Sequence, residues 1–299
     1  MDFQTDFKTF DEKYPVRTRQ VDGLTFSYRL GGNGEKTVVL LVGGFGISDV
    51  FYNHFTRLAE SFTVLTFDYP PETCRNSVLA DGIAALVKEL GLKNVFLVGQ
   101  SYGGLIAQVI AKRHPEIVSG LVLSNTGCID AGMDEAAKNY MLQMAAELKK
   151  YIRIARVVPI KVLKKILLRK MEKQFEQYSP DERKHLTDVF THVFGRMSRE
   201  YEINMCSLML DLENELESTG KAYSYLDGRV LLLLSEDDHT FDDSVKNSLI
   251  RTMPNPVVET KISGGHMALL VNTDLYLQTV IQFINQLENK AGSQNESLK

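Results

Sequence analysis

The chain alternates between two patterns of apolar residues. Runs that are apolar throughout are typical of strands buried on both faces, and apolar residues that recur every three or four positions are typical of helices. Strands that alternate with helices predict a mostly parallel sheet with helices on both faces, which is an α/β fold. The predicted strands are residues 24–30 (half of a hairpin), 37–44, 62–70, 94–100, 119–125, 229–235 and 257–263, and the predicted helices include residues 77–91, 101–114 and 274–287.

The middle of the chain departs from this alternation. Residues 129–225 show helical periodicity and no convincing strand. About a hundred helical residues between two strands predict a cap or lid above one edge of the sheet. We therefore expect a core in two parts, a helical cap between them and a disordered polar tail. The expected boundaries are 1–128 and 226–288 for the core, 129–225 for the cap and 289–299 for the tail.

Composition narrows the class of protein. The 299 residues are 44% hydrophobic and 24% charged, and the formal net charge of −4 gives no overall attraction to nucleic acid. Cys74, Cys128 and Cys206 are widely spaced, which argues against a disulfide framework and indicates buried thiols in a reducing compartment. The first residues include acids and no apolar run, unlike a signal peptide, and no stretch of the chain approaches the ~20 apolar residues of a membrane span. We expect a cytoplasmic protein without nucleic-acid partners or integral membrane association.

The strongest candidate for chemistry is Gly-Gln-Ser-Tyr-Gly at residues 99–103, between a predicted strand and a predicted helix. A serine on such a sharp turn is strained and needs neighbours without side chains, which Gly99 and Gly103 provide. Gly104 lets the helix approach the sheet. The turn would place Ser101 at the carboxyl edge of the sheet, where ligands of α/β proteins bind. The alternative is that Ser101 is only a turn residue of the scaffold.

A serine nucleophile needs a base, and the base needs an anionic partner. His239 and His266 both follow late strands. We expect His266, on a loop after two glycines, to be the base and His239 to face solvent. Asp238 is the expected acid, with Asp237 as the alternative.

The order Ser101, Asp238, His266 is similar to the nucleophile–acid–base order of the α/β-hydrolase superfamily. "LVGQSYGG" resembles its nucleophile elbow, "SEDD" is similar to its Gly-x-x-Asp, and "GGHM" resembles its Gly-His near the C-terminus. The resemblance covers about residues 21–287. It implies the α/β-hydrolase fold, with a helical cap inserted after the sixth strand.

The same resemblance implies an oxyanion hole and a substrate site. "LVGGFGIS" resembles the family's His-Gly-x-Pro loop, so the implied oxyanion donors are the backbone N–H groups of Phe45 and Tyr102. Gly44, Gly46 and Met267 are the implied substrate contacts, since glycines admit close approach.

Three departures from the family pattern stand out. The usual histidine of the oxyanion loop is Gly43 here, Ser235 stands where a glycine is usual, and residues 68–77 replace the family's Asp-x-x-Gly-x-Gly-x-Ser after the fourth strand. None removes a catalytic group. The resemblance implies a serine hydrolase that cleaves a carboxylic ester or related small acyl substrate through an acyl-enzyme, with no metal or organic cofactor. The alternatives are an aminopeptidase, a carbon–carbon hydrolase or a lyase with the same residues, and a non-catalytic binding or adaptor protein.

The predicted cap contains a strongly basic stretch, residues 147–173, which Pro159 divides into two helices. One interpretation is an amphipathic lid that contacts a membrane surface or an anionic substrate. The other, which we favour from sequence, is a cap helix with its apolar face on the core and its lysines in water. Four apolar residues share one helical face: Val162, Leu163, Ile166 and Leu167.

Two further features of the predicted cap concern the substrate. Its methionines and aromatic residues are suited to line an apolar pocket for an acyl or alcohol group. A run of acids is instead suited to bind a substrate amine, although their spacing favours a solvated face. These acids are Asp211, Glu213, Glu215 and Glu217. The sequence gives no indication of the oligomeric state.

Overall fold

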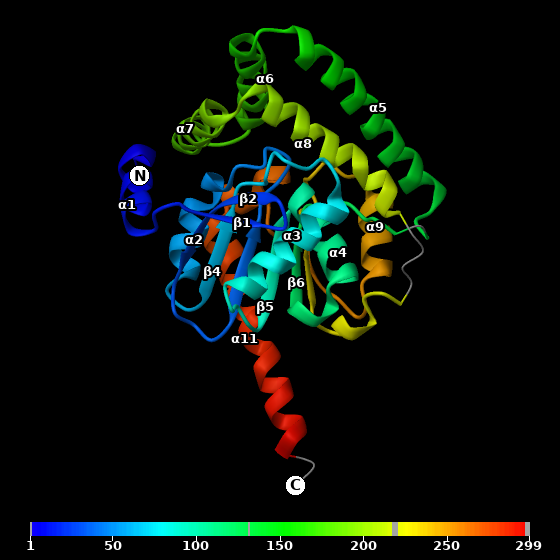
Figure 1. Ribbon diagram of the computed structural model, residues 1–299. Helices are drawn as coiled ribbons and strands as arrows, with labels where there is room; N and C mark the ends of the chain where they lie inside the picture. The colour runs from blue at the N-terminus through cyan, green and yellow to red at the C-terminus, as the bar shows by residue number, and fades with distance from the viewer. Residues whose placement is uncertain (1, 131, 217–220, 297–299) are drawn as a thin grey trace.

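The computed structural model describes residues 2–130, 132–216 and 221–296. An eight-stranded sheet lies at its centre, in the order β1-β2-β4-β3-β5-β6-β7-β8 (Figure 1). The β1–β2 and β2–β4 pairs are antiparallel and all other pairs are parallel, which confirms the mostly parallel sheet. The strands are β1 (Arg17–Val21), β2 (Leu24–Gly31), β3 (Thr37–Leu41), β4 (Thr63–Phe67), β5 (Val95–Gln100), β6 (Val118–Ser124), β7 (Val230–Leu233) and β8 (Val257–Glu259).

Burial explains why the central strands are apolar throughout. Every residue of β3, β5 and β7 is buried, whereas β8 at the sheet edge is mostly exposed. Strands β3 and β8 end three and four residues earlier than predicted, because the chain turns away from the sheet to form loops. Those loops carry the candidate site.

Helices cover both faces of the sheet (Figure 1). The chain runs from β3 to β4 on one side and from β4 back past β3 to β5 on the other, so right-handed crossovers place α2 and α3 on opposite faces. Helix α11 contacts α2, and α4 contacts α3. The core helices are α2 (Tyr52–Leu58), α3 (Asn76–Glu89), α4 (Tyr102–Arg113), α9 (Asp243–Thr252), α10 (Ala268–Val271) and α11 (Thr273–Glu296), with short 3-10 turns η1 (Ser48–Phe51), η2 (Pro115–Ile117) and η5 (Gly265–Met267).

Four helices lie between β6 and β7, where the cap was expected after the sixth strand. We call residues 129–225 the helical insertion. It lies above the carboxyl ends of the strands, and the elbow between α5 and α6 is at the end of the molecule opposite the C-terminus (Figure 1). Pro159 separates these two helices as predicted. The insertion contains α5 (Glu135–Val157), α6 (Ile160–Phe175), α7 (Pro180–Arg196), α8 (Arg199–Asp211) and η3 (Leu212–Glu215), and η4 (Ser224–Leu226) overlaps its end.

The N-terminal helix α1 (Phe3–Lys13) was not predicted. Asp2 caps it by accepting a hydrogen bond from the Thr5 backbone N–H, and Phe3 and Phe10 are buried. Helix α1 packs against α2 and α7. The recurrence of phenylalanine at helical spacing after an aspartate is the signal that could have revealed it.

Two details correct the sequence predictions. Helix α3 begins at Asn76, one residue before the predicted start, and the Asn76 backbone N–H donates to Asp211 Oδ2 of the insertion at 2.7 Å. Cys74 is exposed rather than buried, while Cys128 and Cys206 are buried, and all three are free thiols.

The C-terminal helix also extends further than predicted. Its backbone remains helical to Glu296, so most of the expected tail continues α11, because adding turns to an anchored helix is easier than starting one. Residues 297–299 lie outside the described part. No single helix within that part is long and apolar enough to cross a membrane, although one pair bent by 84°, Gly265–Val271 and Thr273–Leu287, passes by length and composition.

Candidate active site

Ser101 occupies a strained turn between β5 and α4. Its φ of 54° and ψ of −122° are rarely adopted by residues with a side chain. A Cβ at Gly103 would lie 1.9 Å from the Leu41 carbonyl oxygen, and one at Gly99 would lie 2.2 Å from the Gly103 carbonyl oxygen. Both glycines are therefore required for the chain to make this turn.

Thr126 buttresses the turn from the neighbouring strand end. Its hydroxyl donates to the Ser101 carbonyl oxygen at 2.6 Å. A Cβ at Gly104 would lie 2.6 Å from the Thr126 side chain, so this glycine allows the close approach of helix and sheet. Sequence analysis did not identify Thr126.

His266 and Asp238 lie together at the carboxyl edge of the sheet. Asp238 Oδ2 is 3.0 Å from His266 Nδ1, and Asp238 is 1% exposed. Asp237, the alternative acid, is exposed and instead accepts a hydrogen bond from the Gly264 N–H at 2.8 Å. His239 is exposed, as expected.

The surroundings of Asp238 keep its carboxylate charged. Burial alone would raise the pKa of Asp238, but the hydrogen bond and charge of His266 and the Thr240 N–H more than offset this, so the pKa lies below its ordinary value. An ionised carboxylate can hold the His266 Nδ1–H and leave Nε2 as an acceptor.

Asn125 connects the loops that carry the acid and the base. Its side-chain amide donates to Gly265 O at 2.8 Å and to Ser235 Oγ at 3.1 Å, and it accepts from the Ser235 N–H at 2.8 Å. The serine that replaces the family's usual glycine thus has a specific partner. The Lys246 ammonium of α9 donates to Asp238 O at 2.7 Å, which ties the acid loop to that helix.

Gln100 lies between the base and the elbow. Its Nε2 is 3.3 Å from His266 Nε2 and donates to His266 O at 3.2 Å. Ser101 Oγ, by contrast, makes no hydrogen bond within the described part of the chain. A Cβ at Gly43 would lie 2.7 Å from Gln100 Oε1, so the glycine that replaces the family's histidine leaves room for this amide.

The loop after β3 approaches Ser101, since a Cβ at Gly43 would lie 3.5 Å from the Ser101 Cβ. Neither the Phe45 N–H nor the Tyr102 N–H donates to an acceptor in the described residues, and Tyr102 is the first residue of α4, where backbone N–H groups lack helical partners. The Tyr102 side chain is buried, and its hydroxyl donates to Asn76 Oδ1 at 2.7 Å.

Helix α8 covers the glycines predicted to contact substrate. A Cβ at Gly44 would lie 2.9 Å from Met209 Sδ, and one at Gly46 would lie 2.5 Å from Met205 Sδ. The Tyr201 hydroxyl donates to Gly46 O at 2.7 Å. In this conformation both glycines therefore contact α8.

Apolar side chains of α7 surround Phe45. The Phe45 ring lies 5.7 Å from the ring of Phe190 and 5.0 Å from that of Phe194, both edge-on. Met267, the third predicted substrate contact, packs against the same cluster. The Tyr178 hydroxyl, between α6 and α7, donates to Gly264 O at 2.7 Å. The insertion thus contacts both the oxyanion loop and the histidine loop.

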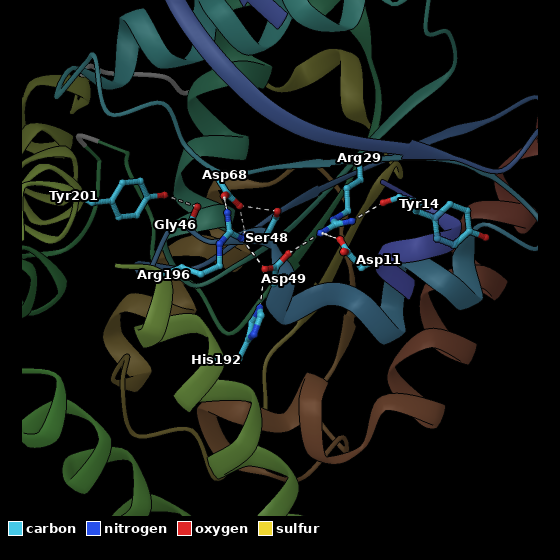
Figure 2. Close-up of polar contacts among 10 residues, drawn as sticks. All are labelled: Asp11, Tyr14, Arg29, Gly46, Ser48, Asp49, Asp68, His192, Arg196 and Tyr201. Carbon is cyan, nitrogen blue, oxygen red and sulfur yellow. Dashed lines mark hydrogen bonds and ion pairs between the residues drawn. The ribbon is translucent and has the colours of Figure 1, made fainter. Parts of the chain in front are cut away.

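A buried ion network joins α7 to η1 and β2 (Figure 2). Asp49 is 4% exposed and is contacted by Arg196 Nη1 at 2.6 Å, His192 Nε2 at 2.9 Å and Arg29 Nη2 at 3.4 Å. Burial opposes the charged form, but these partners more than offset it, so the pKa of Asp49 lies below its ordinary value. Arg29 also pairs with Asp11 of α1 at 2.7 Å.

The same network holds the end of the oxyanion loop. Arg196 also pairs with Asp68, which accepts hydrogen bonds from the Ser48 N–H at 2.8 Å and the Ser48 hydroxyl at 2.7 Å (Figure 2). Ser48 follows Gly46 by two residues. The position of α7 is therefore coupled to the loop that carries Phe45.

The acids considered for amine binding have other partners. Asp211 accepts from the Asn76 N–H and side-chain amide, and Glu213 lies 3.5 Å from Lys149. Glu215 is buried, and Glu217 lies outside the described residues. Within the described part, no group of three or more His, Cys, Asp or Glu side chains is placed to hold a metal ion.

Comparison with known proteins identifies the family of the fold. A family model described as alpha/beta hydrolase fold matches residues 36–273. An uncharacterised protein of Mycobacterium bovis is 27% identical over 153 residues, which cover 48% of this chain and less than half (44%) of that relative. A protein of Caulobacter segnis named as a carbamate hydrolase, RutD, is 22% identical over 284 residues, which cover 90% of this chain and 99% of that one.

A solved structure gives the same architecture. An esterase of Exiguobacterium antarcticum aligns with a TM-score of 0.72 at 19% identity, covering 90% of this chain and 98% of the esterase. At that identity the alignment shows a common fold and nothing about the substrate. The family model, however, covers most of the chain, including Ser101, Asp238 and His266. The chain belongs to the α/β-hydrolase family.

Proposed function

We propose that the protein is a serine hydrolase that cleaves a carboxylic ester or a related acyl substrate through an acyl-enzyme. The observation that carries this proposal is a serine on a strained strand-to-helix turn, at the same sheet edge as a histidine paired with a buried carboxylate. A scaffold has no need of that strain, whereas a nucleophile gains exposure from it.

Each group then has a defined task. Ser101 Oγ attacks the acyl carbon while His266 Nε2 takes its proton, and His266 returns the proton to the leaving alcohol. Asp238 holds the His266 Nδ1–H. The Phe45 and Tyr102 N–H groups donate to the oxyanion, and each such donor contributes on the order of 3 kcal/mol to the barrier reduction. Water then attacks the acyl-enzyme by the same route.

The insertion provides the substrate environment. Met205 and Met209 from α8, and Phe190 and Phe194 from α7, surround the oxyanion loop with apolar surface. Such surface favours an apolar acyl or alcohol group over a charged one. Because α8 contacts Gly44, we propose that substrate enters when the insertion moves as a cap.

The test is hydrolysis of a panel of activated esters beside aminoacyl amides. The wild-type protein should hydrolyse esters, and Ser101→Ala should lower kcat/KM by about 10³-fold or more. Ser119→Ala, a half-buried serine near the amino end of β6 and away from the elbow, is the matched control and should retain activity. Equal ester rates for wild type and Ser101→Ala would contradict the proposal.

One observation favours a second candidate, a non-catalytic binding protein on the same fold. His266 Nε2 contacts Gln100 and not Ser101. Catalytic hydrogen bonds often tighten only when substrate is bound, which is why we prefer the enzyme. No hydrolysis of any ester, together with saturable binding of an apolar ester, would favour the binding protein.

A further inference from the structure

We propose that the elbow between α5 and α6 binds the surface of an anionic lipid bilayer. We call residues 148–171 the basic elbow. This stretch contains nine of the chain's 34 lysines and arginines and no aspartate or glutamate. The formal net charge of the whole chain is −4, so this stretch is strongly positive in a chain that is negative overall.

Most of these nine cationic side chains form no ion pair or hydrogen bond with the described part of the chain. Lys149 and Lys150 have acidic partners, and Lys164 donates to a backbone carbonyl. The other six are exposed and make no ion pair or side-chain hydrogen bond within the described residues. They are Arg153, Arg156, Lys161, Lys165, Arg169 and Lys170.

The elbow also exposes aliphatic side chains. Val157 is 78% exposed, and Ile154, one turn before it, is 51% exposed. Beyond Pro159, Val162 and Ile166 are 46% and 50% exposed. In each helix the two residues are three or four positions apart, so they share a face.

The exposed aliphatic side chains of α6 are not needed to pack this helix against the rest of the fold. Of the four residues predicted to form the apolar face of α6, Leu163 is 1% exposed and Leu167 is half-buried, whereas Val162 and Ile166 face solvent. The interpretation that we favoured from sequence, in which the whole apolar face packs on the core, therefore holds for Leu163 and Leu167 but not for the other two residues.

A bilayer surface is the occupant that matches both features. Lysine and arginine are attracted to anionic headgroups, and aliphatic side chains insert at the boundary with the acyl chains. Nucleic acid would leave the aliphatic residues unused, and the elbow's aromatic residue, Tyr151, is engaged with Glu202 at 2.7 Å. A second copy of the elbow would bring like charges together. The position at the end of the molecule leaves the elbow accessible to a flat surface (Figure 1).

The test is co-sedimentation of the full chain with vesicles. Binding to phosphatidylcholine mixed with phosphatidylglycerol should exceed binding to phosphatidylcholine alone, and added salt should weaken it. Lys161→Glu/Lys165→Glu should reduce the partition coefficient more than tenfold, since each lost cation accounts for roughly fivefold. The matched control is Lys93→Glu/Lys261→Glu, which makes the same charge change at exposed lysines of the core and should bind nearly as wild type.

A second pair of variants tests the aliphatic contribution without changing charge. Val157→Ser should weaken binding about fivefold, whereas Leu275→Ser, at a residue of α11 that is 47% exposed, should not.

Thermal unfolding confirms that all variants fold. Equal binding to neutral and anionic vesicles, equal binding of the charge-reversed variant and wild type, or binding to duplex DNA without binding to vesicles would each overturn the proposal. It does not rest on the proposed function, because vesicle binding is measured independently of ester hydrolysis.

Discussion

Replacing Asp49 by asparagine removes a buried negative charge shared by Arg29, His192 and Arg196. Removing one partner of a buried ion pair costs about 3–5 kcal/mol, because the other partner remains buried without compensation. Arg29 keeps its pair with Asp11, and Arg196 is about one-third exposed. We therefore expect a loss at or just below the lower end of that range for Asp49→Asn, about 2–3 kcal/mol in the free energy of unfolding.

Urea unfolding at neutral pH measures this loss. The control is Asp81→Asn, because Asp81 also pairs with an arginine, Arg113, but its side chain is 44% exposed. Exposed pairs contribute at most about 1 kcal/mol, so the control should unfold close to wild type. Equal losses in the free energy of unfolding for the two variants would refute the reasoning that burial makes the Asp49 ion pairs costly to break. So would a loss below about 0.5 kcal/mol for Asp49→Asn.

The pH dependence provides a second check. The folded protein holds the pKa of Asp49 below its ordinary value of 3.8. The stabilisation is therefore fully present above pH 3.8 and is lost as the pH falls through the folded pKa. The difference between wild type and Asp49→Asn should be constant from neutral pH to about pH 5 and should shrink below pH 4. A difference that grows on acidification would have the wrong sign.

Three further predictions concern the site. Asp238→Asn should lower kcat for ester hydrolysis by on the order of 10⁴-fold, measured on protein that thermal unfolding shows to be folded. Gln100→Ala should lower kcat about tenfold with little change in KM, because it loosens His266; a rise in kcat would show instead that Gln100 holds His266 away from the nucleophile. Gly103→Ala should destabilise the protein by about 3 kcal/mol or more in thermal unfolding, whereas Gly195→Ala, with nothing within 4 Å of the new Cβ, should be neutral or slightly stabilising.

The sheet could be predicted from sequence because its central strands are buried on both faces. β3 and β5 have no solvent face, so their residues are apolar without interruption. Glycines at residues 99 and 103 likewise mark the elbow, since backbone atoms occupy the space where a side chain would be. The assignment of roles to Ser101, Asp238 and His266 remains a prediction that the geometry supports.

The remaining features depend on contacts between distant residues, which local patterns do not encode. The Asn76 N–H at the start of α3 donates to Asp211, which lies 135 positions away in the sequence. Gln100 contacts His266, which lies 166 positions away. Exposure of Ile166 could not be predicted either, because a helical face that is apolar in sequence gives no indication of how much of it the neighbouring helices cover.

The nucleophilic serine is the central claim, and covalent labelling by a fluorophosphonate tests it most directly. The hydroxyl oxygen of an activated serine displaces fluoride, so the intact protein gains one phosphonyl group that mass spectrometry can locate. We predict a single label on the peptide that carries Ser101, loss of labelling in Ser101→Ala, and strongly slowed labelling in His266→Ala. Unlabelled wild-type protein, or a label on another residue that persists in Ser101→Ala, would contradict the account.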